Sequence, residues 1–259
     1  RWVENIIKWM EMVGVTVIRH KPKFIDKIGR GFHKGNGLAN NIYSTLYDDY
    51  YSVVNAFLRI DIPILGFLDD YVLYTDIDVY FAGDITLSDF GIKPNLFAIG
   101  FDDYESKDIM NIGVTLYNIQ GMRRTYNDFV EMAFSEAHIQ TGFYYGSNEG
   151  VLYDGALNLM YIRTTGTDTY DINIIDPIIF NWRPYWSLPQ NRKTSIVHFH
   201  GPSALDYMNH FTNPTNDNPI YKEMFDNCDK IDISESCQLW VNKWIKLHSK
   251  LELGFAVVK

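Results

Sequence analysis

Two aspartates, Asp76 and Asp78, directly follow an apolar run, Tyr71–Thr75, that is typical of a buried strand. Ligands of open α/β sheets bind beyond the carboxyl ends of the strands, so both acids lie where function is expected. Residues two apart in an extended chain point the same way, and both carboxylates could then reach one cation. Oxygen-rich sites suit Mg²⁺ or Mn²⁺ bridging to substrate phosphates. The alternative is a solvated strand end, where aspartate is common.

Histidines and aromatic residues late in the chain are further candidates. His198 and His200 lie at the end of an expected strand, whose alternate residues share a face. Trp182, Tyr185 and Trp186 form an aromatic cluster just before it. Aromatic faces stack on the rings of ligands, so the cluster could line a binding subsite, but Trp and Tyr also fill cores. We favour the core.

Apolar periodicity and glycine and proline punctuation predict the elements that position these residues. Helices are expected over 2–13, 43–62, 122–137, 151–159 and 233–251, and strands over 15–18, 71–75, 95–101, 112–117, 172–175 and 194–199. Strands alternating with helices indicate an α/β fold with a three-layer, mainly parallel sheet. We expect one domain over residues 1–212, then a linker and a C-terminal helical extension over 213–259.

Composition and charge exclude several classes of protein. Of the 259 residues, 46% are hydrophobic, enough apolar surface to offset the entropy of ordering the chain. The net charge of −9 repels phosphate backbones, so nucleic acid is not an expected partner. No apolar run approaches the roughly 20 residues of a membrane helix, and no signal peptide is visible. We expect a soluble protein, cytoplasmic rather than secreted.

Four segments together resemble a known enzyme family. Asn55–Pro63 (NAFLRIDIP) and Tyr71–Val79 (YVLYTDIDV) resemble the core of the GT-A glycosyltransferases, in particular the glycogenin and lipopolysaccharide galactosyltransferase group with its DxD motif. Asn111–Asn118 (NIGVTLYN) and Val197–Pro202 (VHFHGP) resemble two further blocks of that family, in the same order. Four ordered blocks are more specific than any single motif.

The resemblance implies an enzyme that moves a hexosyl or pentosyl group from a nucleotide-sugar donor, by family default a UDP-sugar, to a glycan or other hydroxyl acceptor, with retention. It implies a divalent cation on Asp76, Asp78 and His198, and imidazole favours Mn²⁺ over Mg²⁺. His200 could instead contact the phosphate or replace His198. Asp76 would also touch the ribose, and Arg59 would orient the donor or a carboxylate, or it is a surface residue that bridges helix and loop. The family blocks place Asn111, Gly113 and Gly201 among the donor-binding residues.

The residues nearest the transferred sugar follow from a looser match. Asn148 and Glu149 align with the family's DQD block, which places Glu149 nearest the anomeric carbon as nucleophile or charge stabiliser. Asp102 is a candidate for binding sugar hydroxyls. Glu149 could equally be an acid in the first turn of a helix, and Asp102 an ordinary loop residue.

The sequence departs from the family pattern in two places. Ser203-Ala204 stands where relatives carry a Lys-Pro that neutralises the diphosphate, and the chain begins at Arg1 in a helix, without the family's first strand, so we expect a fragment. A degenerate module that binds nucleotide-sugar or glycan without turnover therefore stays open. An aspartyl-phosphate phosphohydrolase, which also has an Asp-x-Asp at a strand end, is a lesser alternative. Those enzymes need a Thr or similar residue two places after the second Asp, where this chain has Tyr80.

Overall fold

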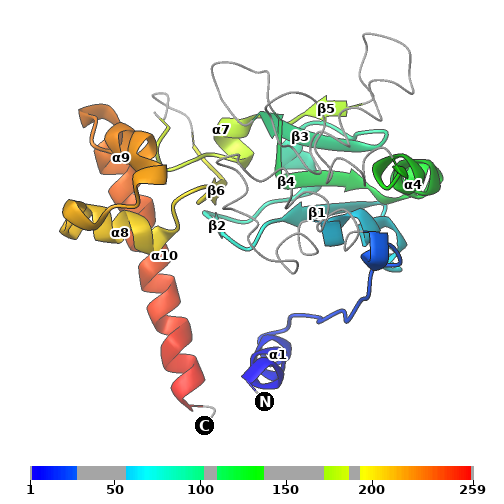
Figure 1. Cartoon of the computed structure of the whole chain (residues 1–259), viewed down its shortest axis with the longest axis horizontal. Coiled ribbons are helices and arrows are strands. Elements are labelled where there is room, and N and C mark those ends of the chain that lie inside the picture. Colours follow the sequence, from blue (N-terminus) through cyan, green and yellow to red (C-terminus); the bar gives the residue numbers. More distant parts are fainter. Residues whose placement is uncertain (1, 28–56, 102–109, 137–171, 187–192, 258–259) are drawn as a thin grey trace. The chain divides into compact units, whose positions relative to one another are not determined.

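The computed structural model describes residues 2–27, 57–101, 110–136, 172–186 and 193–257 (Figure 1). The chain divides into two compact units. The first unit comprises Arg1–Arg19, Thr75–Thr86 and Asp176–Lys259, and the second comprises His20–Tyr74 and Leu87–Ile175.

A mixed sheet forms the centre of the second unit. Its strands are ordered β1-β4-β3-β5, where β1 is Tyr71–Thr75, β3 is Phe97–Phe101, β4 is Met110–Asn118 and β5 is Ile172–Ile174. β3 runs antiparallel to β4 and parallel to β5. Among its described residues, this unit contains the helices η2 (Arg59–Ile64), η3 (Leu87–Phe90) and α4 (Ile119–Ala133). The predicted α/β class is therefore confirmed.

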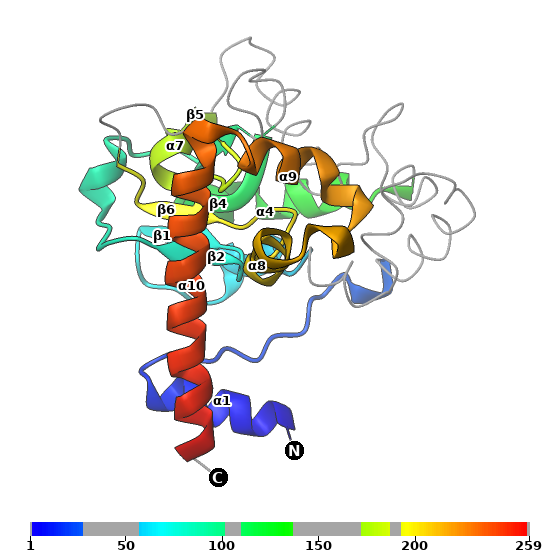
Figure 2. The ribbon, with the colours of Figure 1, turned by 90° about the vertical axis from the view of Figure 1, so that its left-hand side faces the viewer.

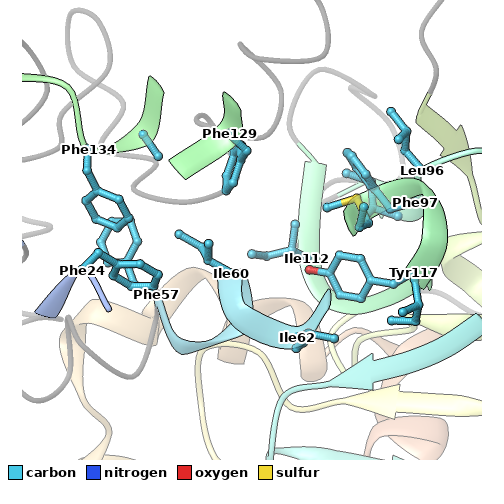
Figure 3. Packing of buried hydrophobic residues seen from close by; sticks show 14 residues of the cluster. Phe24, Phe57, Ile60, Ile62, Leu96, Phe97, Ile112, Tyr117, Phe129 and Phe134 are labelled. Atoms are coloured by element: carbon cyan, nitrogen blue, oxygen red, sulfur yellow. The ribbon is translucent and has the colours of Figure 1, made fainter. Parts of the chain in front are cut away.

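Aliphatic and aromatic side chains together fill the core of this unit (Figure 3). Phe24 stacks on Phe134, with ring centroids 4.4 Å apart, and Phe57 packs on the same ring at 5.4 Å. Strand β3 is buried over four successive residues, as expected for a strand covered on both faces. Helix α4 is capped by the side chain of Asn118, which accepts a hydrogen bond from the Gly121 N–H at 2.9 Å.

The first unit combines a two-stranded ribbon with helices. β2 (Val79–Phe81) and β6 (Ile196–His198) pair antiparallel, with Val79 opposite His198. The helices are α1 (Trp2–Met12), α7 (Pro177–Phe180), α8 (Ala204–Thr212), η4 (Pro214–Asn216), η5 (Pro219–Tyr221), α9 (Lys222–Cys228) and α10 (Ile231–Val257).

Helices α8 and α9 pack against α10 (Figure 2). Their shared core includes Tyr207, Phe225 and Trp240. It continues to Val197 of β6 and to Phe199, which directly follows that strand. Burial of these side chains holds the helices together and, through Phe199, supports the strand that carries His198. In the part of the chain that the structure describes, no helix is long and apolar enough to cross a membrane.

Most predicted elements within the described ranges are confirmed to within a few residues. The strands at 71–75, 95–101 and 112–117 correspond to β1, β3 and β4, and the helices at 122–137 and 233–251 to α4 and α10. Of the helix predicted over 43–62, the structure describes only the end. This end forms the 3₁₀ helix η2, which includes Pro63. The helix predicted over 151–159 lies outside the described residues.

The strand predicted over residues 15–18 is wrong. These residues form no regular element, and Val15 and Ile18 are 41% and 46% exposed. A strand needs a neighbour to satisfy its backbone groups, and none of the described strands pairs with this segment. The domain boundary between residues 212 and 213 stays a prediction, and the first unit contains residues on both sides of it.

Candidate metal centre

A turn, not a continuing strand, carries the two aspartates. The strand β1 ends at Thr75, and Ile77 and Asp78 form a turn before β2 begins at Val79. Ile77 is fully exposed between them. The expectation that Asp76 and Asp78 share a face of an extended chain is therefore wrong in its geometry, although both carboxylates face the same site.

Backbone pairing brings His198 to this turn from a distant part of the sequence. The Phe199 N–H donates to the Asp78 carbonyl at 2.9 Å, on one side of the strand. On the other side, the His198 N–H donates to the Trp182 carbonyl at 2.8 Å. Strand β6 is thus fixed between β2 and residue 182, and the imidazole is placed by hydrogen bonds on both sides.

The side chains of Asp76, Asp78 and His198 converge. One ligand atom of each lies within 4.8 Å of the others, and Nε2 of His198 is 3.4 Å from Oδ1 of Asp78. His198 is fully buried, whereas the side chain of Asp78 is 45% exposed. The three residues come from two segments more than a hundred residues apart, so the folded ribbon, not local sequence, assembles them.

The imidazole of His198 is oriented by a second, buried side chain. Its Nδ1 lies 2.8 Å from Oδ1 of Asn181, an amide oxygen that can only accept, so Nδ1 carries the hydrogen. The lone pair is then on Nε2, the atom that faces the aspartates. Among the residues that the structure describes, this buried Nε2 has no hydrogen-bond partner. A buried nitrogen that lacks a partner and faces two carboxylates fits a metal ligand.

The ionisation of Asp78 also suits a cation site. Burial favours its neutral carboxyl form, but when His198 is protonated its hydrogen bond and its charge outweigh burial, so the pKa of Asp78 is lowered. A smaller contribution comes from His200. Asp78 is therefore an anion at neutral pH. Two carboxylates and one imidazole form a donor set for Mn²⁺ or Mg²⁺, and the nitrogen favours Mn²⁺.

The predicted donor-binding residues lie in different parts of the chain. Arg59, Asn111 and Gly113 belong to the second unit. The Arg59 guanidinium lies over the Tyr74 ring, 5.0 Å from its centroid, and Oδ1 of Asn111 accepts from the Gly113 N–H at 3.0 Å. Their roles toward a donor stay predictions.

Gly201, also predicted to bind the donor, belongs to the first unit and has a structural requirement of its own. Its φ is +90°, and a Cβ there would approach Sδ of Met224 to 2.7 Å. Only glycine adopts this backbone conformation readily. The predicted catalytic residues Asp102, Asn148 and Glu149 lie outside the described residues.

The aromatic cluster belongs to the core, as favoured from the sequence. Trp182 is fully buried, and Tyr185 and Trp186 pack against the same core. The neighbouring Asn181 was missed, as was the three-residue strand β2. Nothing in the sequence singles out one asparagine before a buried tryptophan, and β2 is too short for its alternation to be recognised.

No protein-family model matches the chain, and no curated protein matches it. Solved structures are similar to it at low identity. For the apo-form glycosyltransferase GlyE of Streptococcus pneumoniae TIGR4, the identity is 18%, the TM-score is 0.44, and 72% of this chain and 46% of that chain are covered. This chain thus spans about half the length of GlyE.

Two further structures are similar to the chain at comparable levels. An active-site mutant of LgtC matches with 15% identity, a TM-score of 0.42, and 66% of this chain and 71% of that chain covered. The apo form of mouse xyloside xylosyltransferase 1 matches with 12% identity, a TM-score of 0.46, and coverages of 76% and 80%. With TM-scores below 0.5, these alignments carry no weight for function, which rests on the residues of the site.

Proposed function

We propose that this chain is a metal-dependent glycosyltransferase of the GT-A type, which moves a hexosyl or pentosyl group from a nucleotide-diphosphate donor to a hydroxyl of a glycan or other acceptor. The observation that carries the proposal is the convergence of Asp76, Asp78 and His198 within 4.8 Å. The four family-like sequence blocks also support it, because two of them supply these three residues and the other two follow the same order.

The residues of the site have separate tasks in this proposal. Asp76, Asp78 and Nε2 of His198 hold a divalent cation, Mn²⁺ in preference to Mg²⁺, and Asn181 keeps the imidazole in the tautomer that can bind it. A cation bound there supplies positive charge to the departing diphosphate. Since the chain carries a net charge of −9, a local cation is also needed for an anionic donor to bind.

The remaining sequence predictions complete the proposal. Arg59, Asn111, Gly113 and Gly201 contribute to donor binding, and Asp102, Asn148 and Glu149 lie near the transferred sugar, with uridine as the nucleotide and retention as the outcome. For the whole protein we thus propose a UDP-sugar as donor, a hydroxyl group as acceptor and retention of the anomeric configuration.

Hydrolysis of nucleotide-sugars in the absence of acceptor tests the proposal. A panel of UDP-sugars is incubated with the protein, with and without Mn²⁺, and release of UDP is measured. We expect release from one donor, only with the cation, and its loss in Asp78→Ala. Asp84→Ala is the matched control, because Asp84 is an exposed aspartate of the same unit.

The other outcomes identify the rival functions. Thermal stabilisation by a nucleotide-sugar and Mn²⁺ together, without any turnover, would identify a binding module. Release of inorganic phosphate from a phosphomonoester would identify a phosphohydrolase. UDP release that does not depend on Mn²⁺ or on Asp78 would refute the proposed site.

A further inference from the structure

The only two cysteines of the chain lie side by side in the first unit. Cys228 is the last residue of α9, and Cys237 is in the second turn of α10. Their Sγ atoms are 2.7 Å apart, and both residues are fully buried. Both are free thiols.

The two backbones already hold the sulfurs in position for a covalent bond. The short connection between α9 and α10 folds the helices against each other, so nine positions separate residues that touch. A disulfide bond is about 2.05 Å long, and a small rotation of either side chain closes the difference. The packed position of the two sulfurs is therefore compatible with the bond.

Burial governs when these thiols can react. The hydrogen bond with Cys237, followed by burial, raises the pKa of Cys228. A thiol held in its neutral form is a poor nucleophile, so the native pair resists oxidation until α9 and α10 separate or while the chain folds. Once formed, the bond is enclosed by the same core.

We propose that Cys228 and Cys237 are a redox modification site that forms an intramolecular disulfide by exchange with a low-molecular-weight disulfide such as oxidised glutathione. One cysteine thiolate attacks the small disulfide and releases one small thiol. The second cysteine then attacks the mixed disulfide and releases the other. Two cysteine thiols are oxidised, one small disulfide is reduced to two thiols, and the two protons pass to the released thiolates.

The bond would tie together the helices that support the metal-site strands. Trp240, one turn after Cys237, contacts the Tyr80 ring of β2 at a centroid distance of 5.8 Å. Trp244 contacts Phe199, next to His198, at 6.1 Å. Oxidation therefore stabilises the packing of α9 and α10, and with it the contacts of α10 with Tyr80 and Phe199, whereas reduction weakens this packing. This inference does not depend on the proposed sugar transfer.

Mass measurement after trapping tests the proposal on the full chain. The protein is equilibrated in glutathione buffers, native and during refolding, quenched with acid, alkylated and mapped by peptide mass. We expect the reduced chain to take up two alkyl groups. The oxidised chain should take up none and yield one peptide pair joined through Cys228 and Cys237.

Cysteine variants distinguish the intramolecular disulfide from a reaction of one cysteine alone. Cys228→Ala should yield at most a mixed disulfide with glutathione. A reductant should lower the melting temperature of the oxidised wild type by roughly 5 °C and leave the Cys228→Ala/Cys237→Ala variant unchanged. If both cysteines stay open to alkylation after refolding with oxidised glutathione, or form only links between chains, the proposal is wrong. The wild-type mass measurement decides this even if the variants do not fold.

Discussion

Two groups of aspartate and histidine use the same chemistry to different ends. The group in the second unit consists of His20, Asp61 and Tyr126. It is called the closed cluster, because its carboxylate has all its hydrogen-bond partners within the protein. Oδ2 of Asp61 lies 2.5 Å from Nε2 of His20, and Oδ1 accepts from the Tyr126 hydroxyl at 2.6 Å. Asp61 is fully buried, and both of its oxygens have partners. Burial, followed by the hydrogen bond and charge of Asp61, raises the pKa of Tyr126.

The open cluster in the first unit consists of Asp76, Asp78 and His198. Here the buried Nε2 of His198 has no hydrogen-bond partner among the described residues, and Asp78 is 45% exposed. A carboxylate whose oxygens are both satisfied contributes to folding, whereas facing donors that leave one buried nitrogen without a partner can bind a cation. The difference between the clusters is thus one of hydrogen-bond satisfaction, not of residue type.

Removing the carboxylate of the closed cluster should have the largest effect on stability. Asp61→Ala leaves His20 and the Tyr126 hydroxyl without their buried partner, and we expect the free energy of unfolding to fall by about 3–5 kcal/mol. Mn²⁺ affinity should stay within about twofold if the clusters act independently. Urea unfolding and calorimetric titration measure the two quantities.

The control for this change is Asp69→Ala, an exposed aspartate of the same unit, which should cost less than about 0.5 kcal/mol. Tyr126→Phe gives a milder version, because one hydrogen bond to a charged group contributes about 1.5–3 kcal/mol. If Asp61→Ala lowers the free energy of unfolding no more than Asp69→Ala does, the closed cluster does not stabilise the fold, and the contrast between the two clusters is wrong.

Removing the imidazole of the open cluster should instead affect the metal. We expect His198→Ala to weaken Mn²⁺ binding more than about 100-fold, or about 2.7 kcal/mol, since even an outer-sphere partner commonly contributes 10–100-fold. Free Mn²⁺ measured by electron paramagnetic resonance reports the affinity directly. His210→Gln is the control, because His210 is a histidine of the same unit and outside the convergent set, whereas the His200 ring lies 5.3 Å from that of His198. Equal losses in both variants would mean that the ligand is misassigned.

The open cluster was predicted because its residues fall in short blocks that resemble a known enzyme family. Asp76, Asp78 and His198 were predicted as ligands of one cation, and the fold brings them together. The geometry assumed for the aspartates was wrong, since a turn replaces the extended chain. Strand β2, which sets the register of His198, was not predicted, because three residues show no recognisable alternation.

The closed cluster was not predicted at all. Asp61 lies inside one of the family-like segments, yet its partners His20 and Tyr126 are 41 and 65 residues away. Pairing over such distances depends on tertiary packing, which local patterns do not encode. The predicted strand over residues 15–18 fails for the same reason: β-branched residues favour a strand only where a neighbour pairs with them.

The orientation of His198 gives the next prediction. In Asn181→Leu, Nδ1 loses its acceptor, and we expect Mn²⁺ affinity to fall about 10–100-fold. Asn181→Asp keeps an acceptor at this position, so it should retain affinity within about threefold even though a buried charge lowers stability. If both variants lose affinity in proportion to their stability, Asn181 serves packing alone and does not orient the imidazole.

A third group of aspartate and histidine, around His210, adds a dependence of stability on pH. Nδ1 of His210 lies 2.7 Å from Asp217, and Nε2 lies 3.0 Å from Asp229, so both nitrogens are occupied. Burial opposes the charged form, but the hydrogen bonds and charges of Asp217 and Asp229 outweigh it and raise the pKa of His210 above its ordinary 6.5. The protonated form therefore stabilises the fold below pH 6.5, and this stability is lost as the pH rises through the raised pKa.

We expect the loss to be about 1 kcal/mol, because the aspartates are partly exposed and the attraction is screened. Urea unfolding at about pH 5.5 and about pH 8.5 brackets the transition of a histidine. His210→Gln should remove the difference, whereas Asp226→Asn, which breaks an exposed pair with Lys222, should leave it intact. A wild-type chain as stable at the higher pH as at the lower one would mean that His210 is not held as an imidazolium. The group around His210 would then be neutral and hydrogen-bonded.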